Sequence, residues 1–561
     1  MRSLALLPLA LGALSAAASD SPDPVVFNWF EYTGRDPVSS APTVPGEFRN
    51  PILAGFYPDP DICRVDGTYY IVNSSFAYFP GIPVFRSNDL VNWTQVGNVI
   101  DRPSQLNYDG LGVSRGIFAP SLSHHGDTFY LVCTFVDGGG NFLMTASNPA
   151  GPWSDPVWLG FDGIDPSLFF DDHGRAWLLN NGQPPDNRPL YDGHRAIWMQ
   201  EFDPVARKLI GPREIKVNGG ADIAKHPVWI EGPHLFKKDG WYYLICAEGG
   251  TAEGHSEVVF RSRSVRGPYV PGPENPILTQ RTLPDSRANP VTCTGHADFV
   301  DTPGGDWWAV FLGCRPYATN FYNTGRETFM LPVTWKDGWP TILPPGQPVP
   351  LAVRGPAGVT SSDRVIVALS GNFTWRDSFD GALLAPPWVM LRRPHETWWH
   401  VGNPYPWLMM APSRDTLSGK GNPAFIGRRL QHAHFDASTE VEMTEAAGTS
   451  AGLVAFQNES HHYFFGMRRA KDGSSVFVER LNGKGPETIA RVPVTHAAGI
   501  GLRMSGDDGV LKFEYATHGD GTDGGAWRTL AADVDATVLS TQAAGGFVGT
   551  MIGLHARIDA P

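Results

Sequence analysis

Three carboxylic acids and one histidine occupy matching places in a phrase that the chain repeats five times. The first copy begins with Asp59, framed by prolines, and continues into a short apolar run, a turn and an aromatic strand. The later copies begin with Ala119, Asp165, Glu231 and His296. A single Asp-Pro pair is simply a good turn, but acids at equivalent places in three copies indicate a shared pocket. Two carboxyl groups in one pocket can work as a general acid and a general base.

The elements that position these residues are predicted from the spacing of the copies. Successive copies lie about 46 to 66 residues apart, and no helical pattern separates them. A hairpin repeated at that period is typical of a β-propeller, and five copies predict five blades. If each leading residue opens the innermost strand of its blade, all five gather at one end of the central channel.

Length and composition set the outer limits. With 561 residues, of which 42% are hydrophobic and 18% charged, the chain exceeds what one core usually spans, so two domains are expected. The 63 glycines, 49 prolines and 12% aromatic residues favour turns and short strands over long helices. A formal charge of −13 argues against a nucleic-acid partner, because no basic tract exists to meet phosphates. An acidic surface of this kind suits neutral polymers such as polysaccharides.

The chain divides at a proline-rich stretch. We expect the propeller at 46–345, a linker at 346–362 and a second domain at 363–561, where apolar and polar residues alternate as in half-buried antiparallel strands. The predicted fold class is therefore all-β, a five-bladed propeller followed by a jelly-roll or lectin-like β-sandwich.

Residues 1–18 have the layout of a secretory signal, with Arg2 before an apolar run and small residues after it. No later segment approaches the length needed to cross a bilayer. We therefore expect a secreted, extracellular monomer without a membrane partner.

Among the five cysteines, Cys293 and Cys314 could form a bridge or remain buried thiols. Four glycosylation sequons occur, and the one at Asn73 is expected to stay bare because it lies in an apolar strand.

These phrases resemble glycoside hydrolase family 43, the inverting β-xylosidases and α-L-arabinofuranosidases. Among its members, the chain looks most similar to fungal enzymes that debranch arabinoxylan, including those acting on doubly substituted xylose. The resemblance is specific because its motifs follow one another in the expected order from residue 46 to about 345. They are Asn50–Leu53 with Tyr57–Pro60, Ser87–Trp93, Phe118–Pro120, Asp165–Phe169, Glu231–His234, Ala247–Thr251 and Gly295–Asp298.

The resemblance implies a role for each acid. Asp59 would be the general base, Glu231 the general acid, and Asp165 the acid that orients the donor and raises its pKa. It also implies a sugar pocket lined by Phe76, Phe118, Ala119, Thr251, His296 and Arg315. Phe118 departs from the tryptophan of many relatives, so the stacking face remains but an indole N–H is lost. By position, Tyr191 on the loop 182–194 is a further candidate contact to the polymer, although an ordinary surface loop is an equal alternative.

The chemistry of these residue types agrees with the implied roles. Hydrolysis with inversion needs one carboxylate to deprotonate water and one carboxyl to protonate the leaving oxygen, roughly 6.5–9.5 Å apart. Burial and the charge of Asp165 would keep Glu231 protonated. Arg315 is expected to hold sugar hydroxyls and to help keep Asp59 ionised. For His296 a structural role is favoured, with a structural calcium on the propeller axis as the alternative. No cofactor is expected to be required.

The sequence therefore predicts an exo-glycosidase that removes α-L-arabinofuranosyl side chains from arabinoxylan by inversion. The alternative within the same chemistry is a β-1,4-xylosidase that releases xylose from xylo-oligosaccharides, because the same acids serve both sugars. The alternative from another class is a non-catalytic, carbohydrate-binding propeller, which would need no proton donor.

Overall fold

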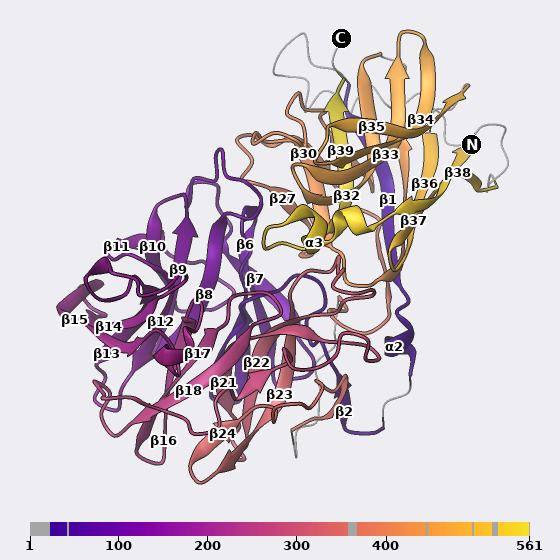
Figure 1. Cartoon of the computed structure of the whole chain (residues 1–561). Helices are drawn as coiled ribbons and strands as arrows, with labels where there is room; N and C mark the ends of the chain where they lie inside the picture. The colour runs from indigo at the N-terminus through magenta and orange to yellow at the C-terminus, as the bar shows by residue number, and fades with distance from the viewer. Residues whose placement is uncertain are drawn as a thin grey trace.

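The computed structural model describes residues 23–41, 44–356, 367–444, 447–495, 499–518 and 526–559. The predicted signal segment and residues 357–362 of the predicted linker lie outside these ranges. Figure 1 shows two all-β bodies, a propeller coloured indigo to pink and a sandwich coloured mainly orange to yellow. Each described helix is too short or too polar to span a bilayer.

The propeller has the five blades that the repeats predict, and each blade is an antiparallel sheet whose first strand lies innermost, against the first strands of the neighbouring blades. Blade 1 contains β3 (Asp61–Val65), β4 (Thr68–Val72), β6 (Gly81–Ser87) and β7 (Thr94–Ile100). Blade 2 contains β8 (Gly116–His125), β9 (Thr128–Val136), β10 (Gly140–Ala146) and β11 (Val157–Leu159). Blade 3 contains β12 (Ile164–Phe170), β13 (Ala176–Gly182), β14 (Ala196–Asp203) and β15 (Lys208–Asn218). Blade 4 contains β16 (Glu231–Lys238), β17 (Trp241–Glu248), β18 (Ser256–Ser262), β19 (Val270–Pro271) and β20 (Leu278–Thr279). Blade 5 contains β21 (Thr292–Asp301), β22 (Trp307–Cys314), β23 (Glu327–Lys336) and β24 (Trp339–Thr341).

The ring of blades closes where the segment before blade 1 lies against blade 5. The Asn50 side chain donates to the Met330 carbonyl (2.9 Å) and accepts from the Met330 N–H (2.8 Å). Leu53 forms a bridge with Thr328 in β23. The last blade thereby fixes the first residues of the propeller. Asp59 lies between this fixed segment and the start of β3.

The second body is a sandwich of two eight-stranded sheets around one apolar core. The first sheet contains β28 (Trp399–Val401), β29 (Leu408–Met410), β1 (Val25–Gly34), β31 (His434–Glu442), β36 (Gly499–Asp507), β37 (Val510–His518) and β38 (Arg528–Asp535), with β26 (Thr374–Asp377) paired to β1. The second contains β35 (Pro486–Val494), β34 (Gly473–Asn482), β33 (His461–Ala470), β32 (Thr449–Asn458), β39 (Met551–Ile558), β30 (Ala424–Arg429), β27 (Val389–Leu391) and β5 (Tyr78–Phe79).

Two strands cross the boundary predicted from the sequence. β1 precedes the propeller in the chain but pairs with β31 inside the sandwich, as the indigo strand in Figure 1 shows. β5 belongs to the propeller segment and pairs with β27. Within the predicted linker, β25 (Ala352–Arg354) pairs with β2 (Glu47–Arg49), so this stretch is packed in a small sheet. Two short helices, α2 (Pro37–Ser40) and α3 (Thr541–Ala544), lie in connections.

A buried ionic cluster fastens the two bodies together. Arg315, at the end of β22, donates to Glu327 (2.6 Å), to Asp36 (3.0 Å) and to the Gln431 carbonyl (3.0 Å). Asp36 and Glu327 are 3% and 0% exposed. Because Asp36 and Gln431 flank strands of the sandwich, one guanidinium joins both bodies. The five cysteines, Cys293 and Cys314 included, are free thiols.

We expect Arg315→Met to lower the free energy of unfolding by about 3–5 kcal/mol, because it leaves two buried carboxylates without a cation. Urea unfolding followed by tryptophan fluorescence measures the loss. The matched control is Arg376→Met, whose partner Glu31 lies 3.2 Å away with the two side chains 46% and 35% exposed, so a loss of about 0–1 kcal/mol is expected. Equal losses in the two variants would contradict a special role for the buried cluster.

Candidate active site

The leading residues of the repeat meet at one end of the channel on a backbone that is bent in every blade. Asp59, Ala119, Asp165 and His296 adopt positive φ angles of 52°, 36°, 53° and 53°. In blade 4 the positive φ of 54° falls on Gly232, next to Glu231. The pairing of the inner strands in blades 2 to 5 shifts register at the same places. Such bulges turn a side chain away from the sheet direction, and here they turn it towards the channel mouth.

Glycine is required at position 232 by the lack of space as well as by the positive φ angle. A Cβ atom built there would lie 2.8 Å from Nε2 of His296. The positive φ and the close imidazole together exclude a larger residue, which explains the glycine that follows the acid in this copy of the repeat.

Asp59 is 6% exposed and is held as an anion. Its carboxylate accepts hydrogen bonds from Ser74 Oγ (2.6 Å) and Arg326 Nη1 (3.0 Å), and His296 Nδ1 lies 3.6 Å away. Burial by itself raises the pKa of Asp59, but the charge of Arg326 and the hydrogen bond from Ser74 outweigh burial and lower the pKa. Ser74 also accepts from the Ala119 N–H (2.7 Å), so the hydroxyl joins blades 1 and 2 at the base.

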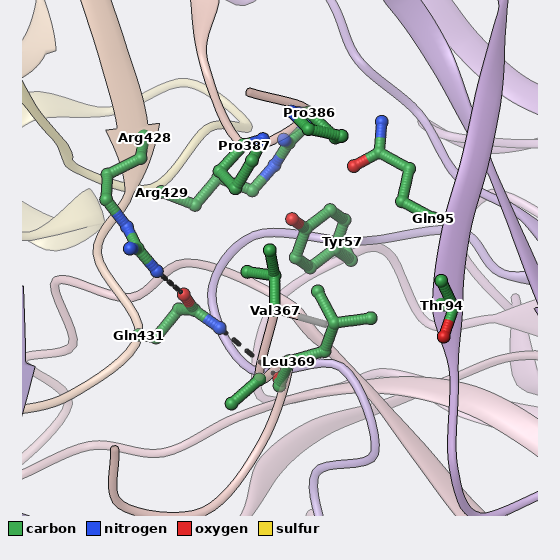
Figure 2. Close-up of a pocket in the computed structure, with 11 residues that line it drawn as sticks. Tyr57, Thr94, Gln95, Val367, Leu369, Pro386, Pro387, Arg428, Arg429 and Gln431 are labelled. Atoms are coloured by element: carbon green, nitrogen blue, oxygen red, sulfur yellow. Dashed lines mark hydrogen bonds between the residues drawn. The ribbon is translucent and has the colours of Figure 1, made fainter. Parts of the chain in front are cut away.

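The segment before Asp59 is fixed from several sides. Asn73 is fully buried, and its amide donates to the carbonyls of Tyr57 (2.9 Å) and Pro58 (3.1 Å). From the sandwich, Arg429 donates to the Phe56 carbonyl (2.7 Å) and lies over the Tyr57 ring at 4.2 Å. Figure 2 shows Tyr57 and Arg429 on the wall of a cavity between the two bodies, and no candidate acid lines that cavity. The sandwich therefore helps to hold the segment that precedes Asp59 in place.

The pKa values of Asp165 and Glu231 are raised, in contrast to that of Asp59. Burial, followed by the charge of Asp59, raises the pKa of Asp165 to about 7. Its carboxylate accepts from the Gly232 N–H at 3.2 Å. Burial, followed by the charges of Asp165 and Asp59, raises the pKa of Glu231 well above its ordinary value. Glu231 is 4% exposed and its Oε1 atom has no hydrogen-bond partner among the described residues. The site thus pairs one ionised carboxylate with one protonated carboxyl.

An aromatic wall lies beside the acids. Phe76 and Phe118 meet edge to face at 5.4 Å, and Phe547 from the sandwich stacks on Phe76 at 6.4 Å and meets Phe118 at 5.6 Å. The Arg326 guanidinium lies 5.6 Å from the Phe547 ring. Apolar ring faces of this kind bind the C–H faces of sugars. Phe76 and Phe118 were predicted from the sequence, whereas Phe547 was missed because it lies in the other body.

The arginine at Asp59 is Arg326, and the prediction of Arg315 is wrong on this point. The Arg315 guanidinium is committed to Glu327 and Asp36 in the interface cluster. Arg326 instead donates to Asp59 and, at 3.5 Å, to the Phe547 carbonyl. Arg315 directly follows β22 and Arg326 directly precedes β23 in the same blade, and only the folded chain distinguishes them.

The sugar contacts predicted for Thr251, Tyr191 and Ala119 remain predictions. Thr251 lies half-buried in the loop after β17. Tyr191 donates to the Gly219 carbonyl (3.0 Å), and its ring stacks between His194 and His226 at 4.8 and 4.7 Å. Ala119 lies 7% exposed at the mouth of the channel.

His296 faces Asp59, and burial lowers the pKa of its imidazole to about 3. A neutral imidazole at this position is consistent with the structural role favoured from the sequence. The alternative of a structural calcium near His296 remains a prediction.

A propeller whose channel mouth pairs an ionised aspartate with a protonated glutamic acid beside an aromatic wall has the architecture of a glycoside hydrolase. The comparison with protein families agrees. The model of glycosyl hydrolases family 43 matches residues 48–340, and the model of the β-xylosidase C-terminal concanavalin A-like domain matches residues 376–559. The chain belongs to glycosyl hydrolase family 43.

Known relatives extend over both bodies. A xylosidase/arabinosidase of Butyrivibrio fibrisolvens is 37% identical, with 91% of this chain and 95% of the relative covered. A non-reducing end α-L-arabinofuranosidase of Bacteroides ovatus is 35% identical, with 91% of each chain covered. The crystal structure of a GH43_12 protein from a capybara gut metagenome is 39% identical, covers 95% of this chain and 99% of its own, and superposes with a TM-score of 0.88.

Replacing Arg326 tests the electrostatics of the base. Because its charge lowers the pKa of Asp59, Arg326→Met raises that pKa, and the base stays protonated to a higher pH. A nearby opposite charge shifts a carboxyl pKa by about 1–3 pH units, so the acidic limb of the kcat/KM profile should move up by about that amount. Arg326→Lys should retain much of the original limb, and Arg315→Met should leave it in place. An acidic limb unmoved by Arg326→Met would contradict the assignment.

Proposed function

We propose that the protein is an exo-acting, inverting glycosidase that removes single α-L-arabinofuranosyl side chains from arabinoxylan. The proposal rests on the opposite pKa shifts of two buried acids, because the pKa of Asp59 is lowered beside Arg326 and the pKa of Glu231 is raised by burial and by the charge of Asp165. Asp59 takes the proton of the attacking water while Glu231 protonates the leaving oxygen. Asp165 holds the Gly232 N–H and adds negative charge that keeps Glu231 protonated.

The burial of the acids supports exo action. Asp59, Asp165 and Glu231 are only 4% to 6% exposed, and the Phe547 ring from the sandwich lies against Phe76 and Phe118. Acids buried to this extent are easier to reach for one terminal sugar than for the middle of a polymer, which an endo-acting enzyme would have to admit along an open groove.

The sugar preference rests on the relatives. The name of the Bacteroides ovatus relative, a non-reducing end α-L-arabinofuranosidase, supports arabinofuranose. A second candidate is a β-1,4-xylosidase, which is favoured by the description of the C-terminal domain and by the double name of the Butyrivibrio fibrisolvens relative. A binding-only propeller is not supported, because binding would not require a protonated glutamic acid.

We also propose export from the cell, because residues 1–18 have the layout of a secretory signal.

Neutralising either acid tests the proposed chemistry. Asp59→Asn and Glu231→Gln should each lower kcat by about 10²–10⁴-fold, the usual contribution of a general acid or base. Glu231→Gln should lose much less activity on an aryl glycoside whose leaving group needs no proton, whereas Asp59→Asn should lose activity on both substrates. The control is Asp301→Asn, whose acid pairs with Arg64 away from the pocket (3.0 Å). Near-normal turnover by a folded Asp59→Asn protein would overturn the assignment.

Product analysis separates the two sugars. Incubation with arabinoxylan and with linear xylo-oligosaccharides should release arabinose from the first and little xylose from the second, and proton NMR should show an inverted configuration in the first-formed sugar. Release of xylose without arabinose would establish the xylosidase alternative instead. A retained configuration would exclude the single-displacement mechanism.

A further inference from the structure

Two neighbouring arginines of the sandwich are buried without a carboxylate partner. Arg428 and Arg429 end β30 and are 1% and 5% exposed. By contrast, the buried Arg315 and Arg392 each meet a carboxylate within 3.0 Å. Arg428 and Arg429 form no ion pair with the residues that the structure describes, so two buried positive charges lack an anion.

The hydrogen bonds of Arg428 leave most of its donors unused. Its Nη2 atom donates to Oε1 of Gln431 (2.5 Å), and the Gln431 amide donates to the Leu369 carbonyl (3.3 Å), as the dashed lines in Figure 2 show. The Nε and Nη1 atoms have no hydrogen-bond partner among the described residues. A guanidinium group has five N–H donors, so the one on Nε and the pair on Nη1 are left over.

Aromatic rings surround the Arg428 guanidinium but only partly offset its burial. The rings of Tyr32 and Trp375 each lie 4.6 Å from it. Burial lowers the pKa of Arg428 to about 10, which means that the surroundings favour its charged form less than water does. Attraction to ring faces is weaker than the desolvation penalty of a buried ion. The charge is therefore incompletely compensated.

Both arginines line the cavity between the propeller and the sandwich that Figure 2 shows. Its volume is about 80 Å³, several times what one water molecule needs. Tyr57, Thr94 and Gln95 add hydroxyl and amide groups to the wall, and none of the described lining residues is acidic. The cavity therefore has room for a small ion, and the charged groups on its wall are all positive.

We propose that this cavity binds one small monovalent anion, chloride or a small carboxylate such as acetate, against Arg428 and Arg429. The unpaired N–H groups of Arg428 are donors that such an anion accepts from. The Arg429 guanidinium supplies further donors, because its one hydrogen bond to the described residues goes from Nε to the Phe56 carbonyl (2.7 Å). The two guanidinium groups repel a cation, and a neutral ligand would leave their charges uncompensated.

The anion stabilises the contact between the two bodies. Without it, two like charges lie buried next to each other at the end of one strand, where their repulsion is poorly screened. Arg429 also holds the Phe56 carbonyl and lies over the Tyr57 ring at 4.2 Å. A bound anion therefore helps to fasten the sandwich to the segment that precedes Asp59.

The test compares thermal unfolding of the full-length protein in sodium chloride, sodium acetate and sodium gluconate at one pH and one ionic strength. Gluconate is the reference, because its anion is too bulky for the cavity. Chloride or acetate should raise the unfolding midpoint by at least about 2 °C over gluconate, and the more effective salt identifies the anion. Calorimetric titration of that anion into gluconate-dialysed protein should show one site per chain.

Arg428→Met should abolish the difference between the salts, because it removes the unpaired donors and one of the two charges. The control is Arg376→Met, whose arginine is 46% exposed beside Glu31 and which should keep the difference seen in the unaltered protein. If Arg428→Met does not fold, Arg429→Met supplies the same comparison.

Three results would overturn the proposal. The first is an unaltered protein with the same midpoint in all three salts, as expected if water alone fills the cavity. The second is a salt difference or a calorimetric site that persists in Arg428→Met, because the anion would then bind elsewhere. The third is a salt difference that Arg376→Met removes to the same extent.

Discussion

The ion pair between Asp59 and Arg326 is the interaction on which the rest of the candidate site depends. Three acids lie buried within reach of one another's charge, and only one of them has an arginine at hydrogen-bond distance. That single cation decides which acid is ionised. Burial and the charge of Asp59 raise the pKa of Asp165 to about 7, and burial with the charges of Asp165 and Asp59 raises the pKa of Glu231 well above its ordinary value. The division of roles therefore follows from one contact rather than from differences among the acids themselves.

The backbone conformation that turns the acids towards the channel mouth costs conformational free energy. Left-handed φ angles at residues with a Cβ cost roughly 1–2 kcal/mol each, and four of the five blades have one at the leading position. Such strain persists only where the surroundings over-determine the conformation. Around Asp59 they do so, since Asn73 and Arg429 hold the carbonyls before it and Ser74 holds its carboxylate.

The sandwich is part of the site rather than an appendage. It supplies Phe547 to the aromatic wall and Arg429 to the segment before the base, and the Arg315 cluster fastens it to blade 5. β1, which precedes the propeller in the chain, and β5, which lies within the propeller segment, both pair with strands of the sandwich, so the sandwich is not continuous in sequence. The relatives match over both bodies, as expected if the two act as one unit.

The sequence by itself determined the repeat, the five blades and the identity of the acids. These follow from local patterns, because a leading residue, a turn and an aromatic strand lie within a dozen positions of one another and recur. The alternation of apolar and polar residues likewise predicted the sandwich strands, since burial of one sheet face leaves a period of two.

Only the tertiary structure decided which distant side chains complete the site. Arg326 and Arg315 are eleven positions apart and carry the same charge, yet one meets Asp59 and the other meets Glu327 and Asp36. Phe547 and β1 reach their places from outside the propeller segment. Such pairings arise from how the propeller and the sandwich pack against each other, and no local period in the sequence encodes that geometry.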